Sequence, residues 1–456
     1  MGDGGNQVTG FGEPPTSARG FSPRTAAFLV VSSTVGAGIL GTAGYVVNDA
    51  GGHAGAILVW AVGGLIAACG ALSLAEVSAS LPRSGGEFVI LSEAYGPLVG
   101  FLGGWVSLVF GFIAPIAATG SLAADYLLGP AGAVAQNAAA TVAIAGFALA
   151  HAAGRSRTER VQGIATSATI VVLSLFIVAG IWAGWPRGGQ VARPPSGHLT
   201  AVGLFVGLVR VSYAYTGWNG VSYVAGEIAN PQRVLPRAIL TGTAIVIALY
   251  LGIVVVIGLA VPASELNLLA KTDHEALERV GDLAANRLFG PRGAAFIAIA
   301  MGLVLLASLS AMILTGPRVA FAMARQGRLP AVFGRVIGRG DSPAAATAAI
   351  ALFAVVLLWS GGFEAIAFAA GVGLALNSLL TVAAVFVLRW RHPDWPRPFR
   401  TPGYPVVPLV FLSLTAAALV FAFLHPATRI KSLAGLGGIA CGVPAYWFST
   451  RRGHRA

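Results

Sequence analysis

The hydrophobic pattern of the chain consists of long apolar runs separated by short polar segments. A membrane-spanning helix needs about 20 apolar residues, because each residue adds about 1.5 Å across a hydrocarbon core about 30 Å thick. Runs of about this length occur at 24–48, 55–80, 99–128, 132–151, 161–185, 199–226, 235–262, 292–323, 343–360, 363–388, 404–424 and 432–450. The pattern predicts an all-α integral membrane protein with about 12 transmembrane helices.

One polar stretch interrupts this pattern, over residues 264–290. We expect it to be a loop that contains a short amphipathic helix, from about Glu275 to Phe289.

Basic residues fall mainly on one side of the predicted spans. With a cytoplasmic N-terminus, 20 of the 29 Lys and Arg residues lie in cytoplasmic segments, 8 lie outside, and Arg210 falls within a span. This asymmetry agrees with the positive-inside rule, and a missed helix would scramble it. We therefore expect both termini, including a polar tail over 1–20, to be cytoplasmic. The Arg-, Ala- and Gly-rich composition is typical of a bacterial chain, which places the protein in a bacterial cytoplasmic (inner) membrane.

The composition excludes a water-soluble protein. The chain is 56% hydrophobic and only 10% charged, with a mean hydropathy of +0.78, whereas soluble domains carry about 25% charged residues. The net charge of +12 arises from loops between apolar runs, so no nucleic-acid partner is expected. Cys69 and Cys441 both lie within apolar runs, which predicts neither a disulfide framework nor a metal site.

Two predicted spans carry glycines and polar residues near their centres. The first span contains VGAGILG at 35–41, and the sixth contains VSYAYTGWN at 211–219. Glycine costs about 1 kcal/mol relative to alanine in a helix interior, so both sequences weaken their helices. Close helix packing through small residues is the alternative explanation for the first motif taken alone.

Interruptions at corresponding positions of two repeats point to a transporter binding site. Unwinding frees backbone N–H and C=O groups, which lipid cannot satisfy and which are tolerated only where they line a cavity. The N-terminus of a half-helix favours an anion such as a carboxylate, and freed carbonyls favour an ammonium group. A zwitterion such as an amino acid satisfies both.

Five motifs occur in an order that resembles a known transporter superfamily. They are GAGI at 36–39; LPRSGGEF at 81–88 with YGP at 95–97 and GGW at 103–105; YTGWN at 215–219 with GEIANPQRVLPRAI at 226–239; PRVAFAMARQGRLP at 317–330; and RPFRTPGYP at 397–405. On these motifs the chain is identified as a member of the amino acid–polyamine–organocation superfamily over roughly residues 25–450. It is most similar to bacterial permeases akin to the L-type neutral amino-acid exchangers.

The resemblance implies a fold of two inverted five-helix repeats with discontinuous helices 1 and 6. The repeats would cover 21–185 and 199–388, and helices 11 and 12 with a cytoplasmic tail would cover 389–456. The substrate-binding residues that the resemblance implies are Thr34, Gly36, Ala37, Gly38, Ile39, Tyr213, Ala214, Tyr215, Thr216, Gly217 and Trp218.

Each of these residues has an implied role. Amides of residues 36–38 would hold the substrate carboxylate, and Ala37 replaces a serine of other members without affecting that backbone role. The ammonium would be held by the carbonyls of Thr34, Tyr213, Ala214 and Thr216. Gly217 would permit the break, and Tyr215 and Trp218 would line or gate the pocket.

Coupling to an ion is less well supported by the resemblance. Several proton-linked or exchanger relatives carry a lysine in helix 5 where this chain has Thr169, and Lys271 and Lys431 lie in loops. Ser308 and Ser310 match helix-8 hydroxyls that bind sodium in other relatives. The alternative for both serine hydroxyls is a hydrogen bond to their own helix backbone. We expect uniport or exchange ahead of symport with H⁺ or Na⁺, and no cofactor.

Arg210 lies five residues before Tyr215 within the sixth span. An arginine at membrane depth is a functional hypothesis by default. It would contact an anionic substrate side chain, pair with a carbonyl or with an acid such as Asp125, or extend to the outer interface. We favour a structural or gating role over substrate contact.

Carboxylates are scarce within the predicted spans. Glu76, Glu87 and Glu93 lie near Arg83 at the predicted cytoplasmic end, where we expect gate or loop ion pairs. This scarcity argues against a polyamine substrate, whose charges would require buried acids.

The chain carries no P-loop, zinc-protease or nucleophile-elbow motif, so we expect a transporter and not an enzyme. The predicted function is secondary active or exchange transport of amino acids, neutral L-amino acids in particular, by alternating access. The alternatives are transport of an amine, polyamine or organic acid on the same fold, and a membrane sensor that binds an amino acid without moving it.

Overall fold

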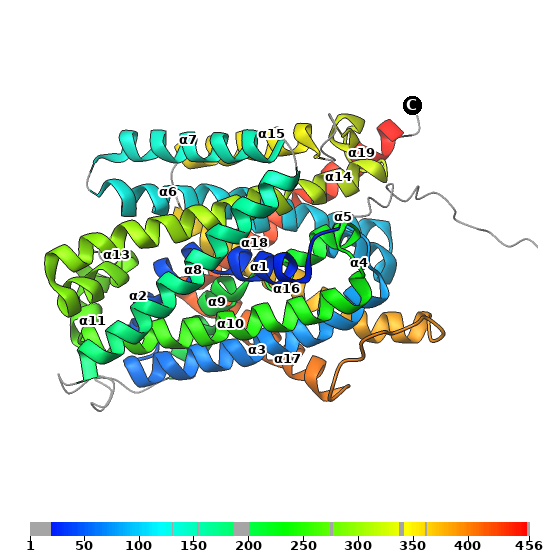
Figure 1. The fold of residues 1–456 in the computed structure, drawn as a ribbon. Helices are drawn as coiled ribbons and strands as arrows, with labels where there is room; N and C mark the ends of the chain where they lie inside the picture. The colour runs from blue at the N-terminus through cyan, green and yellow to red at the C-terminus, as the bar shows by residue number, and fades with distance from the viewer. Residues whose placement is uncertain are drawn as a thin grey trace, which may run out of the picture.

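The computed structural model describes residues 20–129, 131–152, 155–185, 200–273, 277–336, 342–360 and 363–453. Long helices run side by side across the molecule (Figure 1). Within the described residues the only extended pairing is an isolated bridge between Phe21 and Ile228. The predicted all-α class is confirmed.

The helices follow one another in this order: α1 (Pro23–Thr34), α2 (Ala37–Asp49), α3 (His53–Ser80), α4 (Glu87–Tyr95), α5 (Pro97–Val106), α6 (Ala114–Leu128), α7 (Ala133–Ala152), α8 (Arg155–Gly184), α9 (Ala201–Tyr215), α10 (Pro231–Ala260), α11 (Ala263–Thr272), α13 (Val280–Thr315), α14 (Pro317–Arg325), α15 (Ala344–Ser360), α16 (Phe363–Arg391), α17 (Val406–Leu424), α18 (Pro426–Ala440) and α19 (Gly442–Gly453). A π-helical segment, Ser107–Ile113, joins α5 to α6, and 3₁₀ segments cover Gly220–Glu227 and Ala331–Gly334.

Eight of the described helical segments are long and apolar enough to cross a membrane, and the pair α1 and α2, bent by 43° at its break, makes a ninth. Shorter helices occupy the other three predicted spans: α9, α15, and α18 with α19. The count of twelve crossings and the two inverted repeats remain predictions.

The expectation for residues 264–290 was partly wrong. The described part of this stretch contains two helical segments rather than one, because α11 covers most of its first half and a further helical segment begins at Val280. The second segment ends at Gly290, which has a positive φ of 72°, and Pro291 begins the long straight part of α13. Glu275, the expected helix start, lies outside the described residues.

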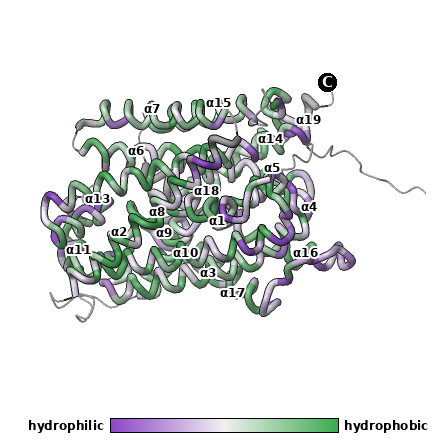
Figure 2. Tube along the Cα trace, in the orientation of Figure 1, coloured by the Kyte–Doolittle hydropathy of each residue, from purple (hydrophilic) through white to green (hydrophobic). Residues whose placement is uncertain are grey.

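Apolar side chains cover the outside of the helical bundle. On α8 a stripe formed by Val171, Leu175, Val178 and Trp182 is more than half exposed, at the spacing of one helix face. Polar residues gather at the two ends of the molecule, with hydrophobic segments between them (Figure 2). An exposed apolar belt between polar ends is the surface of a protein that spans a bilayer.

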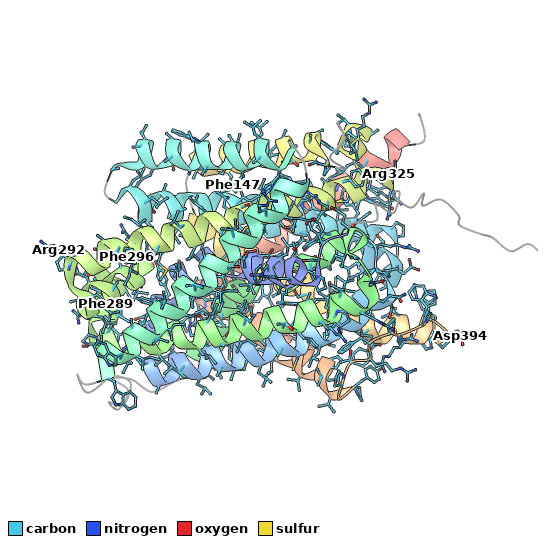
Figure 3. The ribbon with its side chains drawn as sticks, in the orientation of Figure 1. Phe147, Phe289, Arg292, Phe296, Arg325 and Asp394 are labelled. Carbon is cyan, nitrogen blue, oxygen red and sulfur yellow. The ribbon has the colours of Figure 1, made fainter. Side chains whose placement is uncertain are left out.

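The two ends differ in their residues. Arg325 and Asp394 lie at one end of the molecule and Arg292 at the other (Figure 3). We call the end with Arg325 the arginine-rich end, because the basic loops around Arg83 and Arg397 also belong to it. The other is called the opposite end.

Candidate substrate site at two broken helices

The first helix break lies between α1 and α2. The last backbone hydrogen bond of α1 joins Val35 N–H to Val31 O at 2.8 Å. Val35 is extended and Gly36 is non-helical, and α2 begins at Ala37. A helix end leaves up to four carbonyls without intrahelical partners, and a helix start leaves up to four amides. Both sets of groups therefore meet at this break.

The second break follows α9. Thr216 is extended, and its N–H bonds to Tyr213 O at 3.1 Å. Gly217 has a φ of 123°, and a Cβ atom there would lie 2.4 Å from Ser33 O on the first broken helix. Only glycine fits such a conformation and such a contact. The chain continues as the 3₁₀ segment Gly220–Glu227.

The two breaks face each other at the centre of the molecule. A Cβ on Gly38 would lie 2.6 Å from the Cα of Ala214, so the two backbones are in direct contact. The Tyr250 hydroxyl, from α10, lies 2.7 Å from Thr34 O and 3.0 Å from Ala214 O. Tyr250 thereby connects the two breaks. Each carbonyl oxygen has a second lone pair, which keeps both available to a ligand.

A cavity of about 50 Å³ lies between the breaks. By the same measure a single water needs on the order of 10–15 Å³, so the space suits a small solute. The lining residues are Ser33, Thr34, Gly36, Ala37, Gly38, Gly111, Phe112, Pro115, Thr119, Tyr213, Ala214, Thr216, Gly217, Asn219, Gly220, Tyr223, Met312 and Leu374. Eight of the eleven substrate-binding residues expected from the sequence are among them.

The other three expected residues do not line the cavity. Ile39 is fully buried in the core. The Tyr215 hydroxyl donates to Trp60 O at 3.2 Å, and the ring packs against Trp60. Trp218 packs edge-on against Phe411, with ring centroids 6.2 Å apart. In this structure these side chains support the walls of the site and do not face its interior.

A second cavity, of about 40 Å³, adjoins the first and shares Ala37 and Tyr213 with it. Arg210 lines this second cavity, with its Nε 2.9 Å from Asp49 Oδ2 and its guanidinium 4.8 Å from the centroid of Tyr45. The carboxylate partner of Arg210 is therefore the last residue of α2 and not Asp125. The second cavity lies between the substrate cavity and the opposite end.

Several contacts close the arginine-rich end beneath the first cavity. Phe21 N–H bonds to Glu227 O at 2.8 Å, and Phe21 pairs with Ile228 in the isolated bridge. Arg318, only 6% exposed, places its Nε 3.1 Å from Glu227 Oε1. These contacts join the start of α1, the end of the second broken helix and α14.

The sequence profile of the amino acid permease family matches residues 21–433. This chain belongs to the amino acid permease family.

Curated relatives align in sequence with nearly the whole permease. The serine/threonine exchanger SteT of Bacillus subtilis is 27% identical over 430 residues, which are 93% of this chain and 95% of SteT. The mouse large neutral amino acids transporter small subunit 2 is 26% identical, over 94% of this chain and 80% of its own. The mouse Asc-type amino acid transporter 1 is 25% identical, over 88% and 76%. The permease is thus a multi-pass membrane transporter and not an enzyme.

A buried carboxyl lies behind the cavity wall of the permease. Glu87, at the start of α4, is 2% exposed and accepts hydrogen bonds from Tyr223, Asn219 and, at 3.0 Å, the Ser107 hydroxyl. Tyr223 and Asn219 line the cavity, and Ser107 begins the π-helical segment. We expected Glu87 to form an ion pair in a gate or loop at the cytoplasmic end. Among the described residues it has no ion-pair partner.

The other two acids of that group do form ion pairs. Glu76 is bound by Arg389 through two hydrogen bonds of 2.7 and 2.8 Å. Glu93 lies 3.9 Å from Arg83. Both pairs belong to the arginine-rich end of the permease.

None of the three coupling candidates lines the substrate cavity. The Thr169 hydroxyl donates to Ala165 O in its own helix at 3.0 Å. Ser310 donates to Gln162 Oε1 at 3.0 Å and lies 3.0 Å from His151 Nε2. The Ser308 hydroxyl is buried, faces Gly36 and has no hydrogen-bond partner in the described part of the chain. No group of metal-binding side chains occurs within the described residues.

Proposed function

We propose that this permease exchanges neutral L-amino acids across the bacterial cytoplasmic membrane. The observation that supports this most directly is the cavity between the two helix breaks. The amides of residues 36–38 stand at the N-terminus of α2, where the helix dipole favours a carboxylate. Carbonyls of Thr34, Tyr213 and Thr216 stand at the ends of α1 and α9 and accept from an ammonium group.

The side chains of the cavity support a neutral substrate. Its lining contains no Asp, Glu, Lys, Arg or His. A charged side chain enclosed there would lose its hydration without gaining a counter-charge, which costs several kcal/mol. This disfavours a polyamine or a dicarboxylate. The names of two relatives, a serine/threonine exchanger and a large neutral amino acids transporter, agree with this substrate class.

The membrane orientation follows from the charge asymmetry. We place the arginine-rich end and both termini in the cytoplasm, in accordance with the positive-inside rule. Transport then requires that the contacts closing this end separate while the opposite end closes. In the inverted-repeat organisation that we propose, over 21–185 and 199–388, the two broken helices hold the substrate at the midplane during this exchange of access.

The test is uptake of a panel of radiolabelled amino acids into proteoliposomes that contain the purified permease. We expect saturable uptake that depends on amino acid inside the vesicles and does not respond to an imposed proton or sodium gradient. Uptake into empty vesicles that follows either gradient would replace exchange by symport. Transport of an amine or an organic acid but of no amino acid would overturn the substrate assignment, and binding without any uptake would indicate a sensor.

A further inference from the structure

The second cavity carries one base and one acid on its wall. Arg210 lines it from α9, and Glu278 lines it from the segment that leads into α13. The other lining residues are uncharged and belong to α2, α9 and α16. The substrate cavity, by contrast, has no charged residue in its lining. The second cavity is therefore a separate chemical environment on the path toward the opposite end.

The Arg210 guanidinium keeps hydrogen-bond donors for a ligand. Its Nε lies 2.9 Å from Asp49 Oδ2. The terminal nitrogens Nη1 and Nη2 have no hydrogen-bond partner among the residues that the structure describes, and 18% of the side chain is exposed. A guanidinium presents its five N–H donors in a planar fork that matches a carboxylate. Asp49 can therefore hold Nε while a second carboxylate, brought by a ligand, binds the terminal nitrogens.

Glu278 brings the opposite charge to the same cavity. The Tyr45 hydroxyl donates to Glu278 Oε1 at 3.3 Å. The guanidinium carbon of Arg210 lies over the same tyrosine ring, 4.8 Å from its centroid. Tyr45 therefore stands between the base and the acid and holds them at the two sides of one small space. A carboxylate accepts about four hydrogen bonds, so the contact with Tyr45 does not exhaust Glu278.

The second cavity leads directly to the two helix breaks. It shares Ala37 and Tyr213 with the substrate cavity, and the two volumes, about 40 and about 50 Å³, are similar. Ala37 begins α2, and Tyr213 lies near the end of α9, so the two broken helices form the shared wall. A solute that enters from the opposite end passes Arg210 and Glu278 before it reaches the breaks.

We propose that the second cavity is an entry subsite that binds an amino acid before it reaches the helix breaks. Arg210 binds the α-carboxylate, and Glu278 binds the α-ammonium group. A zwitterion satisfies both residues at once. An inorganic anion would face Glu278 across the cavity, and a simple cation would leave the terminal nitrogens of Arg210 without an acceptor. This inference rests on the proposed function, because the ligand is the substrate of that function.

The variant Glu278→Gln tests the subsite, because it removes the charge and keeps the shape of the side chain. Radiolabelled alanine exchange is measured in proteoliposomes whose permease is inserted in one orientation, with alanine varied on one side at a time. We expect the half-saturating alanine concentration to rise about three- to tenfold from the opposite end, the order of magnitude of one charge-assisted hydrogen bond. From the arginine-rich end we expect no rise, because substrate that enters there reaches the breaks first.

A second variant, Arg210→Lys, probes the other half of the subsite. A lysine keeps the positive charge beside Asp49 but lacks the planar fork that binds a carboxylate through two nitrogens. We expect the same one-sided rise in half-saturating alanine. This variant carries the test if Glu278→Gln fails to fold or to insert.

The matched control is Glu265→Gln. Glu265 is another half-buried acid of the opposite end, on α11, where it pairs with Arg287, and neither residue lines either cavity. A partly exposed ion pair of this kind contributes little to stability. We expect the control to keep the wild-type half-saturating concentration from both ends.

The outcomes for the inference and for the proposed function are separate. An unchanged half-saturating concentration from the opposite end in the inserted variant, or an equal rise from both ends, would overturn the inference. Arg210 and Glu278 would then be structural, and alanine exchange by the variant would still support the proposed function. Absence of exchange of any amino acid by folded, inserted wild-type permease would instead overturn the proposed function.

Discussion

Gly217 combines a positive φ with a close approach to the backbone of the first broken helix. Its φ of 123° is unfavourable for any other residue, and an added Cβ would lie 2.4 Å from Ser33 O. We expect Gly217→Ala to reduce amino-acid uptake at least about tenfold, because it costs roughly 1–3 kcal/mol of backbone strain and pushes the two breaks apart. The matched control is Gly437→Ala on α18, where a Cβ meets no atom within 4 Å. Wild-type uptake by Gly217→Ala would show that the breaks are not packed as described.

A second prediction at the scale of single residues concerns Tyr250. Tyr250→Phe removes the hydroxyl that lies between Thr34 O and Ala214 O, and an unsatisfied buried group costs about 1–3 kcal/mol. We expect a lower exchange rate and a changed apparent affinity for alanine, measured over a concentration series. The control is Tyr126→Phe, because the buried Tyr126 hydroxyl has no hydrogen-bond partner within the described residues. If both variants behave alike, the hydroxyl bridge has no role in transport.

The candidate site could be predicted from the sequence only where the backbone itself carries the chemistry. Glycines and polar residues at 36–38 and 213–217 indicated two helix breaks, because such residues are costly in a lipid-spanning helix. Tyr250 gave no such signal, since its role depends on which helices pack together. Trp218 packs against Phe411 past the second break, and a gating role for it stays a prediction.

At the scale of elements, the ion pair between Arg210 and Asp49 connects α2 to α9. Both side chains are mostly buried, with 18% and 17% exposed, so removal of one partner leaves the other poorly solvated. We expect Arg210→Gln and Asp49→Asn each to lower the apparent melting temperature and the exchange rate. The double variant should lose less than the sum of the two, by about 1 kcal/mol of coupling.

The same variants separate the roles considered for Arg210. If Arg210 contacts the substrate and the pair is unimportant, Asp49→Asn should behave like wild type and Arg210→Gln should change only the apparent affinity. Strictly additive effects of the two substitutions on stability would likewise contradict a functional ion pair between α2 and α9.

The sequence predicted the long membrane spans better than the short helices between them, for a physical reason. Long spans such as α3 and α10 follow directly from continuous apolar runs, because lipid permits few other sequences there. Residues 264–290 form no continuous apolar run, so the hydropathy pattern constrains them less. Helix ends in this stretch depend on local features such as the positive φ of Gly290 before Pro291, which a hydropathy pattern does not reveal.

At the scale of the whole molecule, the two ends of the transport path differ. Toward the opposite end, the substrate cavity adjoins a second cavity through Ala37 and Tyr213. Toward the arginine-rich end, the backbone pairing at Phe21 and the ion pair between buried Arg318 and half-buried Glu227 intervene. These contacts resemble a closed gate on the proposed cytoplasmic side. Alternating access then requires that the start of α1 separate from the end of the second broken helix, as well as from α14, in every transport cycle.

A disulfide across this closed end tests that requirement. Phe21 and Ile228 are backbone-paired neighbours, which brings their Cα atoms within the range that a disulfide spans. Cys69 and Cys441 are first replaced by alanine, and Phe21→Cys is then combined with Ile228→Cys. We expect oxidation to stop exchange and a reducing agent to restore it, because the crosslink holds the gate closed, while the two single-cysteine variants stay insensitive to oxidation. Full exchange by permease whose crosslink is verified by mass spectrometry would mean that substrate leaves by another route. In that case the contacts around Glu227 would be static packing, and the gate would have to be sought elsewhere along the broken helices.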